Sequence, residues 1–344
     1  MRRNLLAGGL VILLFFAVLE GGLRLSGLVA TDTLRSPDLE TLDRIPGLFQ
    51  PEQDLIDRVK PAVPFHIHIN SLGFRGREFP LARTAGLARV LCLGDSYTFG
   101  AQVDDADSFP AQLERILSAE EDRRVEVVNA GASGFTITDE LVYLKQRGLA
   151  LHPDLIVLSF SQNDIRDMSQ KHLMIDAMRE HAGLKSTFLL GPTLRFLQHT
   201  AIFNGMQRSA ALVRVAIRTA NEPAIMANSS DLWRRYLLAL EEMVTLARER
   251  GVRFLLVVWP SAAQVAGTEP LDSQEALATA ARGLLLDSLD LFPVLRAVPP
   301  DGAGAFLMPL DGHPSPKGHE VAARAIAGYV AVLLPPGGPA QVER

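Results

Sequence analysis

The sequence has very little cysteine, since Cys92 is the only one in 344 residues. One thiol cannot form an intramolecular disulfide, and this chain alone can hold neither a thiolate zinc site nor an iron–sulfur cluster. The single cysteine also excludes a bacterial lipoprotein anchor, which needs a cysteine directly after its signal. Cys92 lies inside an apolar run, and we expect it to pack there as a small apolar residue.

An excess of positive charge is also lacking. The chain has 34 Lys plus Arg against 39 Asp plus Glu, for a formal net charge of −5. This balance gives no electrostatic footprint for nucleic acid, so no nucleic-acid partner is expected. Hydrophobic residues make up 48% of the chain and charged residues 21%. Such a composition is that of a globular protein and excludes a disordered, collagenous or coiled-coil chain.

Three well-known motifs are missing as well. The sequence contains no Gly-Lys dipeptide, no G-x-S-x-G and no H-E-x-x-H, which excludes a P-loop, an α/β-hydrolase elbow and a zincin site. His66 and His68 share one face of a predicted strand and form the best metal candidate, but no acidic or histidine cluster accompanies them in the sequence. We therefore expect neither a metal nor a cofactor.

The N-terminus carries the longest apolar run. Residues 5–19 are all apolar or glycine, and Glu20 is the next charge. At 1.5 Å per residue the run spans about 22 Å, short of the ~30 Å bilayer core unless residues up to Arg24 extend it. A cleaved signal peptide and a buried core helix are the alternatives. No clean small-x-small site follows, because Leu28 stands where a small residue is needed, so residues 1–30 favour a retained anchor.

The charges beside this run predict its orientation. Arg2 and Arg3 are expected on the cytoplasmic side of a bacterial inner membrane, which makes the chain single-pass and places the rest in the periplasm. Residues 31–64 carry five prolines among charges and predict a stalk with little regular structure. Residues 65–70 alternate with period two and predict a short strand, which completes a stalk and leading strand over 31–87.

The body of the chain alternates between two patterns. Four short apolar runs bounded by Gly, Pro, Asn or Asp predict strands buried on both faces, at residues 90–93, 125–128, 155–160 and 254–259. Helical patterns follow at residues 108–119, 138–147, 231–250, 274–284 and 317–333. This alternation predicts a mostly parallel sheet in a three-layer α/β/α sandwich over residues 88–334. Residues 165–230 have no strand candidate and predict a helical insertion, while 335–344 form a Pro/Gly-rich flexible tail.

Three of the predicted strands are each followed by a residue that could take part in catalysis. Ser96 ends the segment Gly94-Asp95-Ser96, beyond the carboxyl end of a strand, where parallel sheets place ligands. A serine before a helix is also an ordinary cap. Gly131 and Asn163 follow the next two strands, and a backbone N–H and a side-chain amide suit an oxyanion hole. Near the C-terminus, His313 is the best general-base candidate, and Asp311 could orient its imidazole.

Four segments, in chain order, resemble the sequence blocks of the GDSL, or SGNH, hydrolase family: Gly94-Asp95-Ser96, Gly131, Asn163 and Asp311 with His313. The resemblance covers about residues 66–164 and 231–334 and implies that family's flavodoxin-like fold. It further implies the following roles: Ser96 as nucleophile, the Ser96 N–H, Gly131 N–H and Asn163 amide as oxyanion donors, His313 as base and then acid, and Asp311 as its partner. The anchor, stalk and 70–75 turn also resemble membrane-tethered bacterial members of the family.

Two positions depart from the family pattern. Ser161 stands where the family usually has glycine, two residues before the oxyanion asparagine. Only one residue separates Asp311 from His313, where the family usually has two, so Asp287 and Asp290 remain alternative orienters. His319 is expected to lie at the start of the last helix and not to act as a second base.

The resemblance predicts a serine esterase or acyl-transfer enzyme that works through an acyl-serine. An extracytoplasmic location favours O-acetylated cell-envelope carbohydrate as the substrate. A lipase or lysophospholipase is the second hypothesis, and a non-catalytic protein of envelope polysaccharide assembly or binding is the third. The insertion at 165–230 either buries one face against the body or forms a lid beside the catalytic opening.

Overall fold

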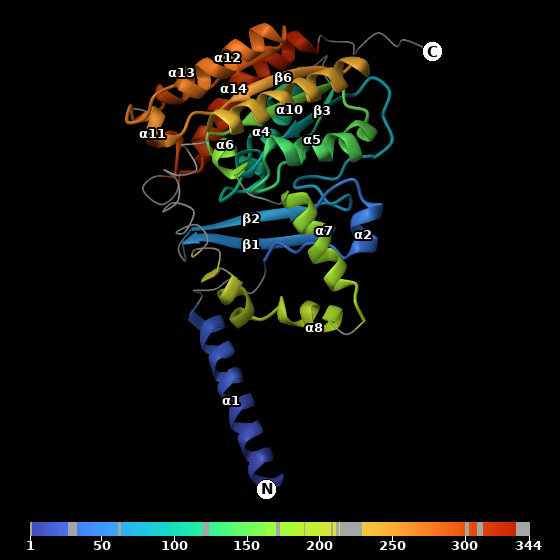
Figure 1. Ribbon diagram of the computed structural model, residues 1–344, viewed down its shortest axis with the longest axis vertical. Coiled ribbons are helices and arrows are strands. Elements are labelled where there is room, and N and C mark those ends of the chain that lie inside the picture. The colour runs from blue at the N-terminus through green and yellow to red at the C-terminus, as the bar shows by residue number, and fades with distance from the viewer. Residues whose placement is uncertain are drawn as a thin grey trace.

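A five-stranded parallel sheet forms the centre of the protein in the computed structural model (Figure 1). The structure describes residues 2–26, 33–60, 63–119, 124–169, 173–188, 190–207, 209–210, 213, 229–299, 303–307 and 312–334. The strands, in sheet order, are β4 (Val125–Asn129), β3 (Ala88–Leu93), β5 (Leu155–Phe160), β6 (Arg253–Val258) and β7 (Asp287–Asp290). Every neighbouring pair is parallel, which confirms the predicted sheet.

Helices cover both faces of this sheet. One face carries α5 (Ile137–Gln146), α10 (Ser229–Glu249) and α12 (Asp272–Gly283), and the other carries α4 (Phe109–Ser118), α13 (Phe292–Arg296) and α14 (Pro316–Leu333). Alternate strand residues supply the two cores: Leu91 packs on the first face, while Val90 and Cys92 pack on the second. The three-layer sandwich is therefore confirmed, and Cys92 is the buried apolar residue that was expected.

Strand β7 was not predicted. Its sequence is Asp-Ser-Leu-Asp, and only Leu289 is buried in it. It pairs with β6 at the edge of the sheet, so one neighbour and one buried side chain are enough to hold it. A strand of this kind has neither an apolar run nor a sustained alternation, which are the two patterns that identify strands in a sequence.

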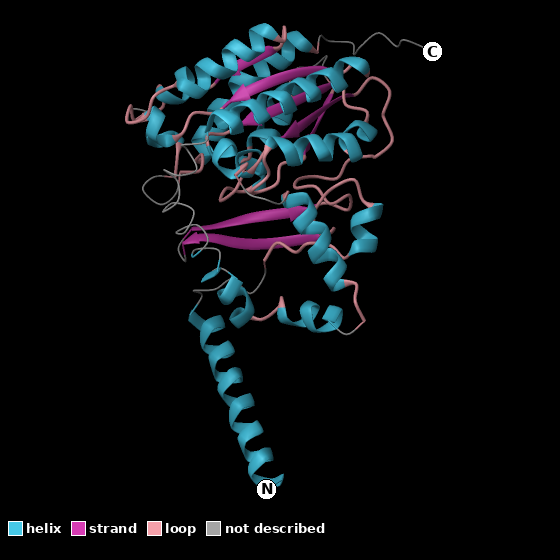
Figure 2. Cartoon of the chain, viewed as in Figure 1, coloured by secondary structure: helices cyan, strands magenta, loops and turns pink. Residues whose placement is uncertain are grey.

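The expectation of little regular structure in residues 31–64 is wrong. This segment holds α2 (Leu39–Arg44) and β1 (Gln53–Lys60), and β1 pairs antiparallel with β2 (Val63–Ile69) as a hairpin separate from the main sheet (Figure 2). Buried Leu55 lies opposite buried Ile67, while the side chains on either side of Leu55 are exposed. The sequence hides this alternation, because the buried face also carries polar Gln53 and the exposed face carries apolar Ile56.

Helix α1 (Arg2–Ser26) extends away from the rest of the protein (Figure 1). Residues Gly8–Ser26 have a mean hydropathy of 1.9, and none of this stretch is buried. The helix is long and apolar enough to cross a membrane, a test that a signal sequence also passes. The other described helices either bury at least one face or are too short to span a bilayer.

The insertion is helical in the part that the structure describes. It contains α7 (Met174–Lys185), α8 (Leu190–Leu197) and a further helical stretch at 201–207, and no strand occurs among its described residues. Helix α7 packs beside α2, where an Arg179 guanidinium nitrogen lies 2.9 Å from a carboxylate oxygen of Asp43. The insertion thus rests on the N-terminal segments, on the side of the body that faces α1 (Figure 1).

Candidate active site

Ser96 lies where the central strand β3 turns into a short helix. The strand ends at Leu93, and Gly94 follows with φ +152°, where a Cβ would collide with the side chain of Thr98. Helix α3 (Ser96–Phe99) is capped by Asp95, whose Oδ1 accepts the Tyr97 N–H at 2.9 Å. Ser96 is therefore the first residue of α3 and is partly exposed at the carboxyl edge of the sheet.

His313 meets Ser96 across 217 positions of sequence. The His313 Nε2 lies 2.9 Å from the Ser96 Oγ. Backbone hydrogen bonds hold the histidine segment on both sides, because Leu307 N–H donates to His313 O at 2.9 Å and Ser315 N–H donates to Ala305 O at 2.8 Å. The Tyr97 hydroxyl donates to Gly312 O at 2.9 Å and so ties this segment to α3. The structure brings the predicted nucleophile and base within hydrogen-bonding distance.

The predicted partner of His313 falls on a part of the chain that the structure does not describe. Asp311 lies outside the described residues, so its role stays a prediction. The described neighbour of His313 Nδ1 is Gln102, whose Nε2 lies at 3.5 Å. Of the two alternatives, Asp290 accepts the Phe292 N–H at 2.9 Å, and Asp287 is exposed at the start of the edge strand.

Asn163 and Ser161 gather around the carboxylate of Asp95. The Asn163 Nδ2 donates to Asp95 Oδ2 at 2.9 Å, and the Ser161 Oγ lies 2.8 Å from both Asp95 Oδ2 and Asn163 Oδ1. A side-chain amide carries two N–H hydrogens, so one remains for another acceptor. Ser161, which departs from the family pattern, therefore contacts both the Asp95 carboxylate and the Asn163 side chain.

Gly131 is engaged inside its own loop. Its N–H donates to Asn129 Oδ1 at 3.1 Å, and a Cβ at this position would collide with the backbone of α3. Gly134, three residues later, has φ +84°, and a Cβ there would lie 2.9 Å from Met174 Cε of α7. The loop is joined to Gly94 through a hydrogen bond from Ala132 N–H to Gly94 O at 3.0 Å.

A cluster of buried acids lies behind the nucleophile. Glu140 on α5, Asp164 and Asp95 are each about 1% exposed, and Tyr236 on α10 is fully buried beside them. Burial raises the pKa of Glu140 and of Asp164 well above their ordinary values, and the charge of Asp95 raises both further. Asp164 Oδ1 lies 3.3 Å from Ser161 Oγ, so a protonated Asp164 can donate to that hydroxyl. Burial therefore favours the neutral form of Glu140 and of Asp164.

No metal is indicated by the side chains that the structure describes. Their His, Cys, Asp and Glu residues form no group of three or more that could hold an ion. His68 Nδ1 instead lies 2.6 Å from Asp54 Oδ1 on the paired strand of the hairpin. His68 and Asp54 belong to the two-stranded hairpin, which is a different sheet from the one whose strand β3 leads into Ser96.

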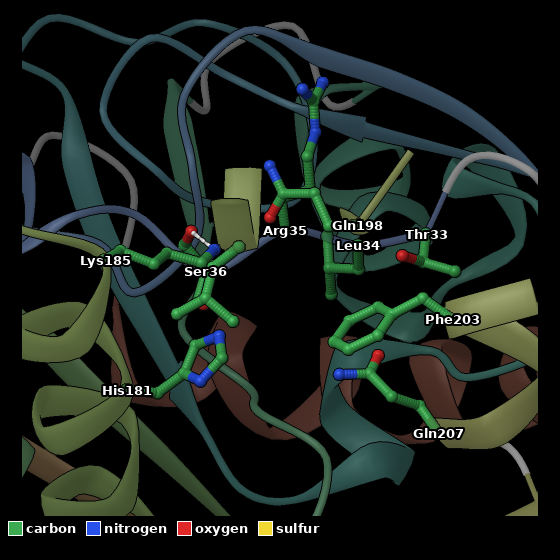
Figure 3. Close-up of a pocket in the computed structure, with 10 residues that line it drawn as sticks. Thr33, Leu34, Arg35, Ser36, His181, Lys185, Gln198, Phe203 and Gln207 are labelled. Atoms are coloured by element: carbon green, nitrogen blue, oxygen red, sulfur yellow. Dashed lines mark hydrogen bonds between the residues drawn. The ribbon is translucent and has the colours of Figure 1, made fainter. Parts of the chain in front are cut away.

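A small cavity lies away from Ser96, between the Thr33–Ser36 segment and the insertion (Figure 3). Its volume is ≈ 50 Å³, far below the ~300–1,000 Å³ of small-molecule sites. Lys185 and His181 both line this cavity (Figure 3). The Lys185 Nζ donates a hydrogen bond to Ser36 O at 2.7 Å. This cavity therefore belongs to the packing of the insertion and not to the Ser96 site.

The hydroxyl of Ser161 provides a first test of the arrangement. We expect Ser161→Ala to lower kcat about 10-fold with little change in KM, less than the ~10²–10³ lost with a whole oxyanion donor, because the Asn163 amide loses a partner that orients it. Steady-state kinetics on a p-nitrophenyl ester measures the split.

Ser159→Ala is the matched control for this variant. Ser159 lies two residues earlier in β5, is buried, and its Oγ has no hydrogen-bond partner in the described residues. Removing an unpaired buried hydroxyl should leave kcat unchanged. Equal kinetics for Ser161→Ala and the parent would contradict the positioning role of Ser161.

Comparison with known proteins places this site in a family. A model of the GDSL-like lipase/acylhydrolase family matches residues 92–321, a span of more than half of the chain that includes Ser96 and His313. No curated protein matches. Similar solved structures include a lipase/acylhydrolase from Enterococcus faecalis (17% identical, 73% of this chain and 100% of that chain, TM-score 0.43) and a catalytic mutant of an acetylxylan esterase from Geobacillus stearothermophilus (18%, 70% and 92%, TM-score 0.41).

Proposed function

Because the chain belongs to the GDSL-like lipase/acylhydrolase family and is therefore an ester-hydrolysing enzyme, we propose that it cleaves its substrate through an acyl intermediate on Ser96. The observation that carries the proposal is the 2.9 Å contact between Ser96 Oγ and His313 Nε2. A serine hydroxyl is a weak nucleophile until an adjacent base removes its proton, and this contact supplies that base.

The reaction proceeds in two halves. As Ser96 Oγ attacks the ester carbonyl, its proton passes to His313 Nε2, and a tetrahedral intermediate forms. His313 then gives the proton to the leaving alkoxide oxygen, the ester C–O bond breaks, and the acyl group stays on Ser96. In the second half His313 takes a proton from water, which attacks the acyl carbon, and the carboxylic acid leaves as the Ser96 hydroxyl reforms.

Three donors are proposed for the oxyanion. The first is the N–H of Ser96, which as the first residue of α3 has no intrahelical acceptor. The second is the remaining amide hydrogen of Asn163. The third is the N–H of Gly131, the donor expected from the sequence, which lies against the backbone of α3 and donates to Asn129 Oδ1 at 3.1 Å. Asp311 keeps its proposed role as the orienter of His313.

The proposed substrate is O-acetylated carbohydrate of the cell envelope. The support is location, because α1 is exposed, apolar and long enough to anchor the enzyme at a membrane. With Arg2 and Arg3 on the cytoplasmic side, the site would work in the periplasm. A lipase or lysophospholipase is the second candidate, favoured by Phe188 and Phe196, which are 91% and 70% exposed in the insertion. Intact Ser96 and His313 argue against a non-catalytic binding role.

Acyl-chain preference separates the two substrates. We expect the full chain in detergent to hydrolyse p-nitrophenyl acetate with a kcat/KM at least about 10-fold above that for the octanoate, since a methyl pocket discriminates by ~10–200-fold per misplaced methylene. Release of acetate from an acetylated polysaccharide is then measured directly. Faster turnover of the octanoate would reject the carbohydrate proposal in favour of lipid esters, and Ser96→Ala reports the background.

A further inference from the structure

The insertion exposes apolar side chains that the protein itself does not cover. Phe188 and Phe196 are the two exposed phenylalanines outside α1 among the described residues, and Leu184 and Met206 are 48% and 67% exposed. Leu184 belongs to α7, Phe188 to the turn before α8, Phe196 to α8 and Met206 to the helical stretch at 201–207. Exposed aromatic side chains grouped on one segment mark a surface that has a partner.

The same segment is joined directly to α1. The Glu20 carboxylate accepts the N–H groups of Ala201 and Ile202 at 2.8 and 3.0 Å, and so caps the helical stretch at 201–207. The Arg24 guanidinium pairs with Glu20 at 2.6 Å and donates to His199 O at 2.6 Å. These contacts lie in the last two turns of α1, at the end of its apolar stretch. The insertion is therefore held at the level where α1 would leave a bilayer.

Figure 1 shows what this attachment does to α8. The helix lies beside the C-terminal end of α1, at about the same level and on the α1 side of the β1–β2 hairpin, and the catalytic sheet lies farther away. A helix at the level where a membrane span ends, with an exposed aromatic side chain such as Phe196, has the placement of an interfacial helix. The buried Lys185 at the end of α7 instead contacts the N-terminal segment, where its Nζ donates to Ser36 O at 2.7 Å.

We propose that the surface formed by Leu184, Phe188, Phe196 and Met206 rests on the lipid bilayer, in the interface beside the exit of α1. Burial of phenylalanine and leucine side chains in the headgroup region stabilises the membrane-bound state. The Glu20 and Arg24 contacts hold the segment at that level. The enzyme then has two attachments to the membrane, the span and the insertion. Two attachments fix the height and the tilt of the Ser96 site, which a single flexible connection would leave free.

The test measures where these side chains lie in the full chain. The variants Phe188→Cys and Phe196→Cys are labelled with an environment-sensitive NBD dye and reconstituted into vesicles of phosphatidylethanolamine and phosphatidylglycerol. Leu285→Cys is the control, because Leu285 is 87% exposed and follows α12, at the opposite end of the protein from α1 (Figure 1). The native Cys92 will not compete for the dye, because it is fully buried and burial raises the pKa of its thiol.

The expected result is a blue-shifted emission at positions 188 and 196 and severalfold stronger quenching there by doxyl-labelled lipids than at position 285. Labels at 188 and 196 that aqueous iodide quenches as strongly as the one at 285 would overturn the proposal. Protection that grows with the protein-to-lipid ratio would also overturn it, since a second copy of the chain would then be the partner. Ester turnover of each labelled protein is followed in the same vesicles, so that failure of the surface and failure of the catalytic assignment are seen separately.

Discussion

Replacing Ser96 with alanine is expected to lower ester turnover by about 10⁴–10⁶, to the background of the assay, because no other group takes the acyl chain. The thermal transition should stay nearly unchanged. Ser96 Oγ contacts His313 Nε2 at 2.9 Å and approaches Asp95 Oδ2 only at 3.4 Å, so few contacts disappear with it. The cap of α3 is the Asp95 carboxylate and not the serine hydroxyl.

Two measurements check this expectation. Turnover of p-nitrophenyl acetate gives the activity, and a fluorophosphonate probe followed by intact-mass analysis gives the covalent modification of the serine. Ser133→Ala is a suitable control, since Ser133 is an exposed serine in the neighbouring loop. Probe labelling that persists in Ser96→Ala, or a transition that collapses with it, would assign Ser96 a structural role instead of a chemical one.

The central sheet could be predicted because its strands are buried on both faces. Strands such as β5, with six consecutive buried residues, leave an apolar run that few other structures produce. Strands β1 and β7 could not be predicted, because neither shows an apolar run or a sustained alternation, whereas the alternation at 65–70 did predict most of β2. In β1 the buried Leu55 alternates with charged or exposed neighbours, and in β7 a single leucine is buried. Their pairing depends on partner strands that local sequence does not reveal.

The meeting of Ser96 with His313 could be expected from topology, since parallel strands bring their carboxyl ends to one edge. The hydrogen bonds of the proposed oxyanion donors could not, because the Gly131 N–H meets Asn129 Oδ1 and the Asn163 amide meets Asp95 Oδ2 only in the folded loops. The position of Asp311 lies outside the described residues, so the third member of the proposed triad stays a prediction.

The buried acids were also invisible in the sequence. Glu140 lies one turn into α5 in a stretch with ordinary helical patterning, where a glutamate is normally solvent-exposed. Only packing of α5 against α10 encloses it beside Asp164 and Tyr236. Burying charged carboxylates near Ser96 lowers the stability of the fold. The raised pKa of Glu140 lessens this loss, because it favours the neutral form of that side chain.

Replacing His313 with alanine is expected to lower kcat/KM by about 10²–10⁴, or more where the nucleophile depends on the base, because Ser96 then loses the acceptor of its proton. The fold should survive, since His313 is partly exposed and its segment is held by the backbone bonds of Leu307 and Ser315. Added imidazole should restore part of the activity by entering the space beside Ser96 Oγ. A variant with unchanged turnover would remove His313 from the mechanism.

His319 is the matched control, because it lies six residues away and cannot do the same work. It is fully buried, its Nδ1 accepts the Phe109 N–H at 3.2 Å, and its ring stacks on that of Phe109. Burial, together with the charges of Arg75 and His313, lowers the pKa of His319 to about 3, so the ring stays neutral wherever the enzyme is folded and active. His319→Gln should therefore lower the melting temperature while the folded fraction keeps its kcat and gains nothing from imidazole. Equal catalytic losses in both variants would show that the two histidines act as one structural unit, and the assignment of His313 as the base would fail.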